Sequence, residues 1–173
     1  MSKRIFLGLI LGILLAPLAA HAQMQQYVDN GDAKVALWLP GDWVLHVWSL
    51  TNPSGALSHA MDVQTGRQVV VQLYSCGEDE RDSWASGEKA EMLLGSQADA
   101  IAPADEQTAQ LMPDSGSFVT TTKRDSLTYS GRAFFAVRSG RCYVIQLIST
   151  EGDFEGSLDT FSAIAKDMRF RED

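Results

Sequence analysis

Two runs of strand-forming residues constrain the fold of this chain most. They are Gln68 to Cys76 (QVVVQLYSC) and Arg141 to Thr150 (RCYVIQLIST). Both are rich in β-branched and aromatic residues, which favour strands, and both adjoin glycines that favour turns. The first run is continuous enough to predict a central strand that is covered on both faces. The chain must therefore build a sheet and supply other elements to cover it.

Further strand patterns lie on either side of these runs. On either side of Pro40-Gly41-Asp42, every second residue of 35–39 and of 43–47 is large and apolar. These residues are Val35, Leu37, Leu39, Trp43, Leu45 and Val47. This pattern predicts a β-hairpin in which Leu39 opposes Trp43, so that one face of the hairpin is buried. Additional strands are predicted at 57–63, 118–123 and 132–138.

Helices are predicted at three places. Acidic residues at 78–82 favour a helix start by their interaction with the helix dipole, and this helix continues to Leu94, before Gly95. A short helix is expected within the long connection 96–117. The clearest helix carries Phe154, Leu158, Phe161, Ala165 and Met168 on one stripe, with Asp153 placed to cap its start.

The order strands, helix, strands, helix predicts a single α+β domain over 34–173, with a mostly antiparallel sheet and helices packed on it. Residues 23–33 are polar and contain an Asn-Gly turn signal, so a flexible lead-in is expected there.

The first 22 residues have the pattern of a secretory signal peptide. Lys3 and Arg4 precede an apolar run, and Ala20-His21-Ala22 is a small-x-small cleavage site. The apolar run is shorter than the roughly 20 residues that span a bilayer, so no membrane span is expected. The pattern predicts a periplasmic or secreted protein that begins at Gln23.

Charge narrows the range of partners. The chain has 14 basic and 22 acidic residues, and removal of the leader leaves 12 basic against 22 acidic groups, a formal charge of −10. This charge repels phosphate backbones, so nucleic acid is not expected as a partner. The partner is predicted to be an unidentified protein or small ligand, with a cationic partner favoured electrostatically.

The two cysteines, Cys76 and Cys142, follow the leader into an oxidising compartment. A disulfide between them is the natural interpretation. The alternative is two buried free thiols, because sequence alone does not place their Cα atoms within bridging distance.

Residues for catalysis or metal binding are sparse. After the leader, only His46 and His59 could serve a Ser-His-Asp triad, and no Gly-x-Ser-x-Gly motif is present. The histidines and cysteines are too scattered for a zinc site. Glu151, Asp153 and Glu155 partly match a calcium loop, but its twelfth position is a serine. No catalytic residue, metal or cofactor is predicted.

The predicted hairpin places Trp38, His46 and Trp48 on the face opposite its apolar core. Two tryptophans and a histidine would form an amphipathic partner surface if they are exposed. The alternative is that a helix covers them, as it would in a sandwich with helices on both faces of the sheet.

Several short motifs, in this order, make the chain after the leader resemble the PsbP-like family, which includes DcrB-type bacterial periplasmic proteins and shares its fold with a Ran-binding import factor. The motifs are Leu39-Pro40-Gly41-Asp42-Trp43, a Ser130-Gly131-Arg132 turn, Tyr143-Val144-Ile145, and a last helix that ends in Met168-Arg169-Phe170. The resemblance implies an α/β/α sandwich and a binding or accessory role without catalysis. It implies no particular partner.

Two functions are expected from these observations. The first is an exported, non-enzymatic binding or accessory protein. The alternative is an immunity protein or inhibitor of a cell-wall-degrading enzyme, which export, acidity and a disulfide would suit. Ser130-Gly131 is similar to the short loop that some lysozyme inhibitors insert into the active cleft, but a Ser-Gly pair is a common turn and adds little to this alternative.

Overall fold

In the described part of the chain, the larger sheet has seven strands and is antiparallel throughout. The computed structural model describes residues 24–30, 34–49 and 56–171. The strand order is β3-β4-β5-β9-β8-β7-β6. In that order the strands are Val44–Ser49, Ala56–Met61, Gln68–Ser75, Arg141–Thr150, Leu127–Arg138, Gly116–Arg124 and Ala100–Pro103. The predicted strand 68–76 is therefore interior, paired with β4 on one side and β9 on the other.

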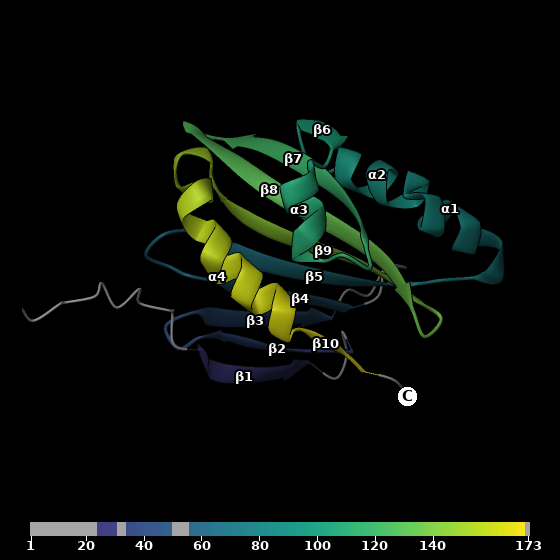
Figure 1. Cartoon of the computed structure of the whole chain (residues 1–173), viewed down its shortest axis with the longest axis horizontal. Coiled ribbons are helices and arrows are strands. Elements are labelled where there is room, and N and C mark those ends of the chain that lie inside the picture. The colour runs from purple at the N-terminus through teal and green to yellow at the C-terminus, as the bar shows by residue number, and fades with distance from the viewer. Residues whose placement is uncertain (1–23, 31–33, 50–55, 172–173) are drawn as a thin grey trace, which may run out of the picture.

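A smaller sheet joins the two ends of the described chain. Its order is β1-β2-β10, with β1 at Met24–Asn30, β2 at Val35–Pro40 and β10 at Arg169–Phe170. Figure 1 shows these strands beside the β3 edge of the larger sheet, with α4 crossing in front. Val35, Leu37 and Leu39 on β2 are almost fully buried and belong to the main core.

The helices are α1 (Arg81–Ser86), α2 (Glu88–Gly95), α3 (Glu106–Leu111) and α4 (Phe154–Asp167). Short 3-10 turns at Glu78–Glu80 and Glu151–Asp153 precede α1 and α4. In Figure 1, α4 lies in front of the sheet, and α1 and α2 lie at the upper right. The predicted α+β class with a mostly antiparallel sheet and helices packed on it is confirmed.

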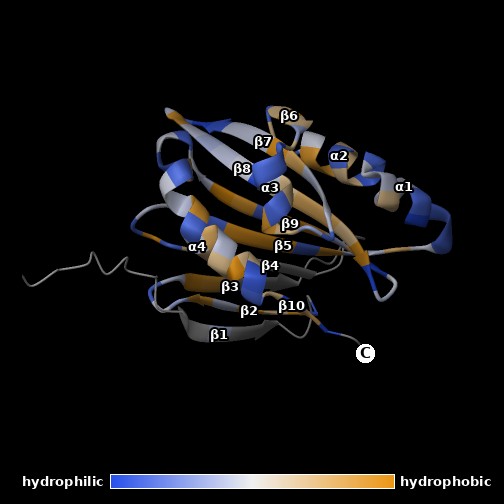
Figure 2. Ribbon diagram, in the orientation of Figure 1, coloured by the Kyte–Doolittle hydropathy of each residue, from blue (hydrophilic) through white to orange (hydrophobic). Residues whose placement is uncertain are grey.

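Two apolar cores lie on opposite faces of the larger sheet, because neighbouring residues on a strand point to opposite sides. Phe134 belongs to the core with α4, and Phe135 belongs to the core with α1 and α2. Figure 2 shows hydrophobic residues concentrated on the strands and mixed colours along α4. Of the predicted α4 stripe, four residues are buried and Leu158 is partly buried.

The predicted helix 78–94 is interrupted at Gly87. Its φ of 86° is left-handed, and a Cβ there would lie 2.6 Å from the ring of Phe135. Glycine is favoured in this conformation and at so close an approach. Residues of both α1 and α2 are buried in the same core, and α2 ends at Gly95, one residue beyond the predicted end at Leu94.

The predicted hairpin between 35–39 and 43–47 is wrong. β2 pairs with β1 and β10, whereas β3 pairs with β4 in the other sheet. The burial that the alternation predicted is nevertheless observed, since Leu39 and Trp43 are both buried in the same core. β2 pairs with the strand just before it and with the distant β10, and β3 pairs with the strand just after it, and alternation within 35–47 does not identify these partners. The flexible lead-in is also corrected: residues 24–30 form strand β1.

Two further expectations are corrected. Ser130-Gly131 is not a turn, because both residues lie inside β8 and pair with β7 and β9. Asp153 makes no side-chain capping bond to α4, since its carboxylate instead accepts hydrogen bonds from Arg67. The last helix ends at Asp167, and Arg169–Phe170 forms β10.

None of the described helices has the length and apolar character needed to cross a membrane.

Candidate functional site

A pocket of about 360 Å³ lies on one face of the larger sheet. It is on the same face as the core beneath α1 and α2, as the register shows: Gln72 pairs with Val144, and Val144 belongs to that core. The lining residues come from β4, β5, β7, β8 and β9 and from the segment after α2: His59, Gln68, Val70, Gln72, Gln97, Thr122, Arg124, Tyr129, Gln146 and Ile148.

Strand alternation explains why these side chains share one face. On β5, Val69 and Val71 point into the main core, so Gln68 and Gln72 point to the opposite side. On β9, Ile145 and Leu147 are likewise core residues, which places Gln146 and Ile148 on the pocket face. On each of these strands, one set of alternate side chains faces the main core and the other set faces the pocket.

The pocket exists because α1 and α2 cover only part of this face. Over the covered part, Tyr74 packs against Trp84 of α1, with ring centroids 5.3 Å apart, and Leu94 of α2 is fully buried. The helix ends at Gly95, and Gln97 follows as a wall of the pocket. The prediction that β5 is covered on both faces is therefore right at its Tyr74 end and wrong at its Gln68 end.

Gln146 is the most buried polar residue of the pocket, at 8% exposure. Its Nε2 donates hydrogen bonds to Oε1 of Gln72 at 3.4 Å and to Oε1 of Gln97 at 3.2 Å. Gln97 also shares a side-chain hydrogen bond with Tyr74, whose pKa is raised by burial. Three amides from different elements are thus joined into one network.

A second pair forms the β4 side of the pocket. His59 Nε2 lies 3.1 Å from Oε1 of Gln68, at hydrogen-bonding distance. The Gln68 amide nitrogen also donates to the carbonyl of Gly66 at 3.4 Å. In the strand register His59 stands opposite Val70 of β5 and His46 of β3.

The opposite side is formed by the ends of β7 and β8. Thr122 and Tyr129 are register partners and both are half-buried, whereas Arg124 is exposed at the rim. Among the described lining residues, Arg124 and the imidazole of His59 are the basic groups, and none is a carboxylate or a cysteine. The described lining therefore offers mainly hydrogen-bonding amide, hydroxyl and imidazole groups.

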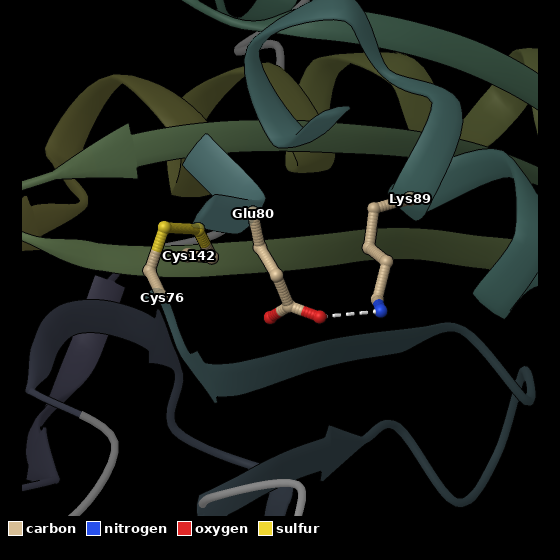
Figure 3. Close-up of a disulfide and its surroundings, with 4 residues drawn as sticks. All are labelled: Cys76, Glu80, Lys89 and Cys142. Atoms are coloured by element: carbon tan, nitrogen blue, oxygen red, sulfur yellow. Dashed lines mark hydrogen bonds and ion pairs between the residues drawn. A yellow bond between two sulfur atoms is a disulfide. The ribbon is translucent and has the colours of Figure 1, made fainter. Parts of the chain in front are cut away.

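The predicted disulfide joins Cys76, just after β5, to Cys142 on β9, with Cα atoms 5.4 Å apart. Tyr74 pairs with Cys142 in the register, which brings the end of β5 to this point. Figure 3 shows the bridge near an ion pair between Lys89 and Glu80, 2.7 Å long. The disulfide thus lies at the Tyr74 end of the sheet face that α1 and α2 cover.

The predicted partner surface is not assembled by a hairpin. Trp38 lies on β2 with 40% exposure, and its ring packs 5.2 Å from that of Tyr27. His46 and Trp48 lie on β3 in the other sheet, and their side chains fall outside the described part of the structure. A joint surface of these three residues stays a prediction.

No pocket was predicted from the sequence, although a signal for it exists. Glutamines interrupt the apolar sequences of two interior strands. Gln68 and Gln72 lie four residues apart on β5, and Gln146 lies on β9. Long amides are uncommon in buried positions unless they have partners. The glutamines alternate with core residues such as Val69, Val71 and Ile145, so the sequence indicates one polar face and one buried face of these strands.

Among the described residues, no group of three or more His, Cys, Asp or Glu side chains is placed to hold a metal ion. Asp153, from the partial calcium motif, is bound by Arg67 at 2.8 Å and 3.2 Å and by the hydroxyls of Ser149 and Ser157.

Neither protein-family models nor curated protein sequences match this chain. Among solved structures it is similar to a crystal structure from Bacteroides thetaiotaomicron VPI-5482, with a TM-score of 0.49 and 6% identity over 87% of this chain and 50% of that one. The chain thus spans half the length of that protein. It is also similar to the solution structure of PsbP (CyanoP) from Synechocystis sp. PCC 6803, with a TM-score of 0.48 and 9% identity over 84% of this chain and 92% of that one. At these identities the likeness concerns the fold, not a ligand or a partner.

Proposed function

We propose that this chain is an exported, non-enzymatic binding protein that holds a small polar ligand in the pocket on its sheet. The observation that carries the proposal is Gln146, which is 92% buried yet placed at a pocket and not in an apolar core. A buried amide is retained at a cost unless its hydrogen-bonding groups are used. A ligand would use the groups that the protein leaves open.

Export is supported by two features. The first is the leader pattern of residues 1–22, and the second is a disulfide, which persists in oxidising compartments. We expect the exported chain to begin at Gln23. Intact mass measurement of periplasmic or secreted material checks this, and retention of Met1 in that material contradicts it.

Binding is tested by native mass spectrometry of the protein after incubation with small molecules extracted from its host. We expect an adduct that is retained by Gln107→Leu, an exposed amide on α3, and lost by Gln146→Leu. No adduct, or an adduct equally present in both variants, contradicts a ligand site at this pocket.

The inhibitor alternative rested on export, acidity and a disulfide, with Ser130-Gly131 as a minor addition, and only that addition is lost. Ser130 and Gly131 are paired on both sides within β8, so they form no loop that could enter the cleft of an enzyme.

A further inference from the structure

We infer that the sheet-face pocket recognises an uncharged, polyhydroxylated ligand, the chemistry of a mono- or disaccharide. The inference rests on the proposed binding function and specifies the class of ligand.

The lining has the donor and acceptor pattern that such a ligand needs. Four glutamines line the pocket, and each amide offers one acceptor oxygen beside two N–H donors. Neighbouring hydroxyls on a sugar ring can likewise donate and accept from adjacent positions. Amide and diol can therefore bond to one another at two points.

The key amide is held in place before any ligand arrives. Because Gln146 Nε2 donates to both Gln72 and Gln97, its orientation is set by the protein. Its Oε1 accepts no hydrogen bond from the described residues and is left to a donor in the pocket. A hydroxyl group would satisfy this oxygen, and preorganisation of the amide lowers the entropic cost of binding.

Charge argues against an ionic ligand. Among the described lining residues a cation would find no carboxylate, and an anion would find the exposed Arg124 and the imidazole of His59 on an exported chain of formal charge −10. Val70, Ile148 and the ring of Tyr129 add apolar surface, which suits the C–H groups of a sugar. The volume of about 360 Å³ is suited to a small ligand.

The position of the pocket argues against an extended peptide. Peptides that add to a sheet use the free backbone groups of an edge strand. The floor of this pocket is formed by β5, β9 and β8, and each of these strands is paired on both sides. Recognition here must use side chains.

The test is a titration followed by the side-chain amide signals of glutamine in two-dimensional NMR. The probes are glucose, N-acetylglucosamine and maltose, with inorganic phosphate, spermidine and glycylglycine as ligands of other classes. We expect at least one sugar to shift the signals of Gln72, Gln97 and Gln146 in a saturable way. Gln146→Leu should weaken that binding at least about tenfold, as expected for loss of a buried hydrogen-bonding group, and Gln107→Leu should not change it.

Circular dichroism establishes that each variant is folded. Where Gln146→Leu does not fold, Gln72→Met, at a half-buried position, decides the same question. The sugar class is overturned if none of the three sugars shifts these signals, or if phosphate, spermidine or glycylglycine binds in their place. Failure of all six probes while the Gln146-dependent adduct persists overturns only the ligand class. Loss of both results overturns the binding function as well.

Discussion

Phe161 shows how a single residue of the α4 stripe contributes to stability. It is fully buried and lies with its ring centroid 5.8 Å from that of Phe154. Phe161→Ala should destabilise the protein by about 3 to 5 kcal/mol, because it leaves a cavity in a packed core. Urea denaturation measures this, with exposed Ser162→Ala as the control that should be nearly silent. A loss below about 1 kcal/mol contradicts the assigned packing.

The ionisation of Asp153 makes the stability of the fold depend on pH. The Arg67 guanidinium donates hydrogen bonds to its carboxylate, and this interaction is the main reason that the pKa of Asp153 lies below its ordinary value. Because the pKa is lower in the folded state, the stabilisation is complete above the unfolded pKa of about 3.9. It is lost as the pH falls through the folded value.

We therefore expect Asp153→Asn to destabilise the protein at pH 7 and to lose part of that effect near pH 3, below the unfolded pKa. The side chain is 38% exposed, so the effect at pH 7 should be on the order of 1 kcal/mol or less. Denaturant unfolding at the two pH values measures it, with exposed Asp159→Asn as the control. A difference between wild type and variant that is the same at both pH values would refute the ion-pair argument.

At the scale of elements, Gly87 decides how the helical segment covers the sheet. Gly87→Ala places a Cβ in the left-handed region and against Phe135, and it should destabilise the protein by about 1 to 3 kcal/mol. Gly152→Ala is the matched control, since a Cβ there meets nothing within 4 Å. Thermal melting of the two variants compares them. Equal melting temperatures would show that the helix break does not depend on glycine.

Local patterns predicted some elements well and others poorly, for identifiable reasons. The strand 141–150 and the stripe on α4 were predicted because each buries a regular set of side chains. The hairpin of β2 with β3 was wrong, because β10 and β1 supply the partners of β2. The partner β10 lies far along the chain, beyond the reach of a local pattern. β6 carries little burial, so no pattern marked it.

At the scale of the whole molecule, the disulfide joins two segments 66 residues apart. Closing a loop of this length restricts the unfolded chain and should stabilise the fold by on the order of 4 kcal/mol, as an upper value. Reductant should therefore lower the melting temperature by several degrees. The non-reduced protein should contain no titratable thiol, and two reactive thiols in native protein contradict the bridge.

The sequence by itself determined much of the apolar core, the α+β class and the candidate disulfide pair. These properties follow from short-range periodicity and from residue chemistry, which each segment carries wherever it is placed. Tertiary structure alone decided the partners of β2 and the length of sheet that α1 and α2 cover. The pocket around Gln146 depends on both strand register and helix length. It exists only where segments distant in the chain meet, because pairing and coverage are properties of the assembled sheet.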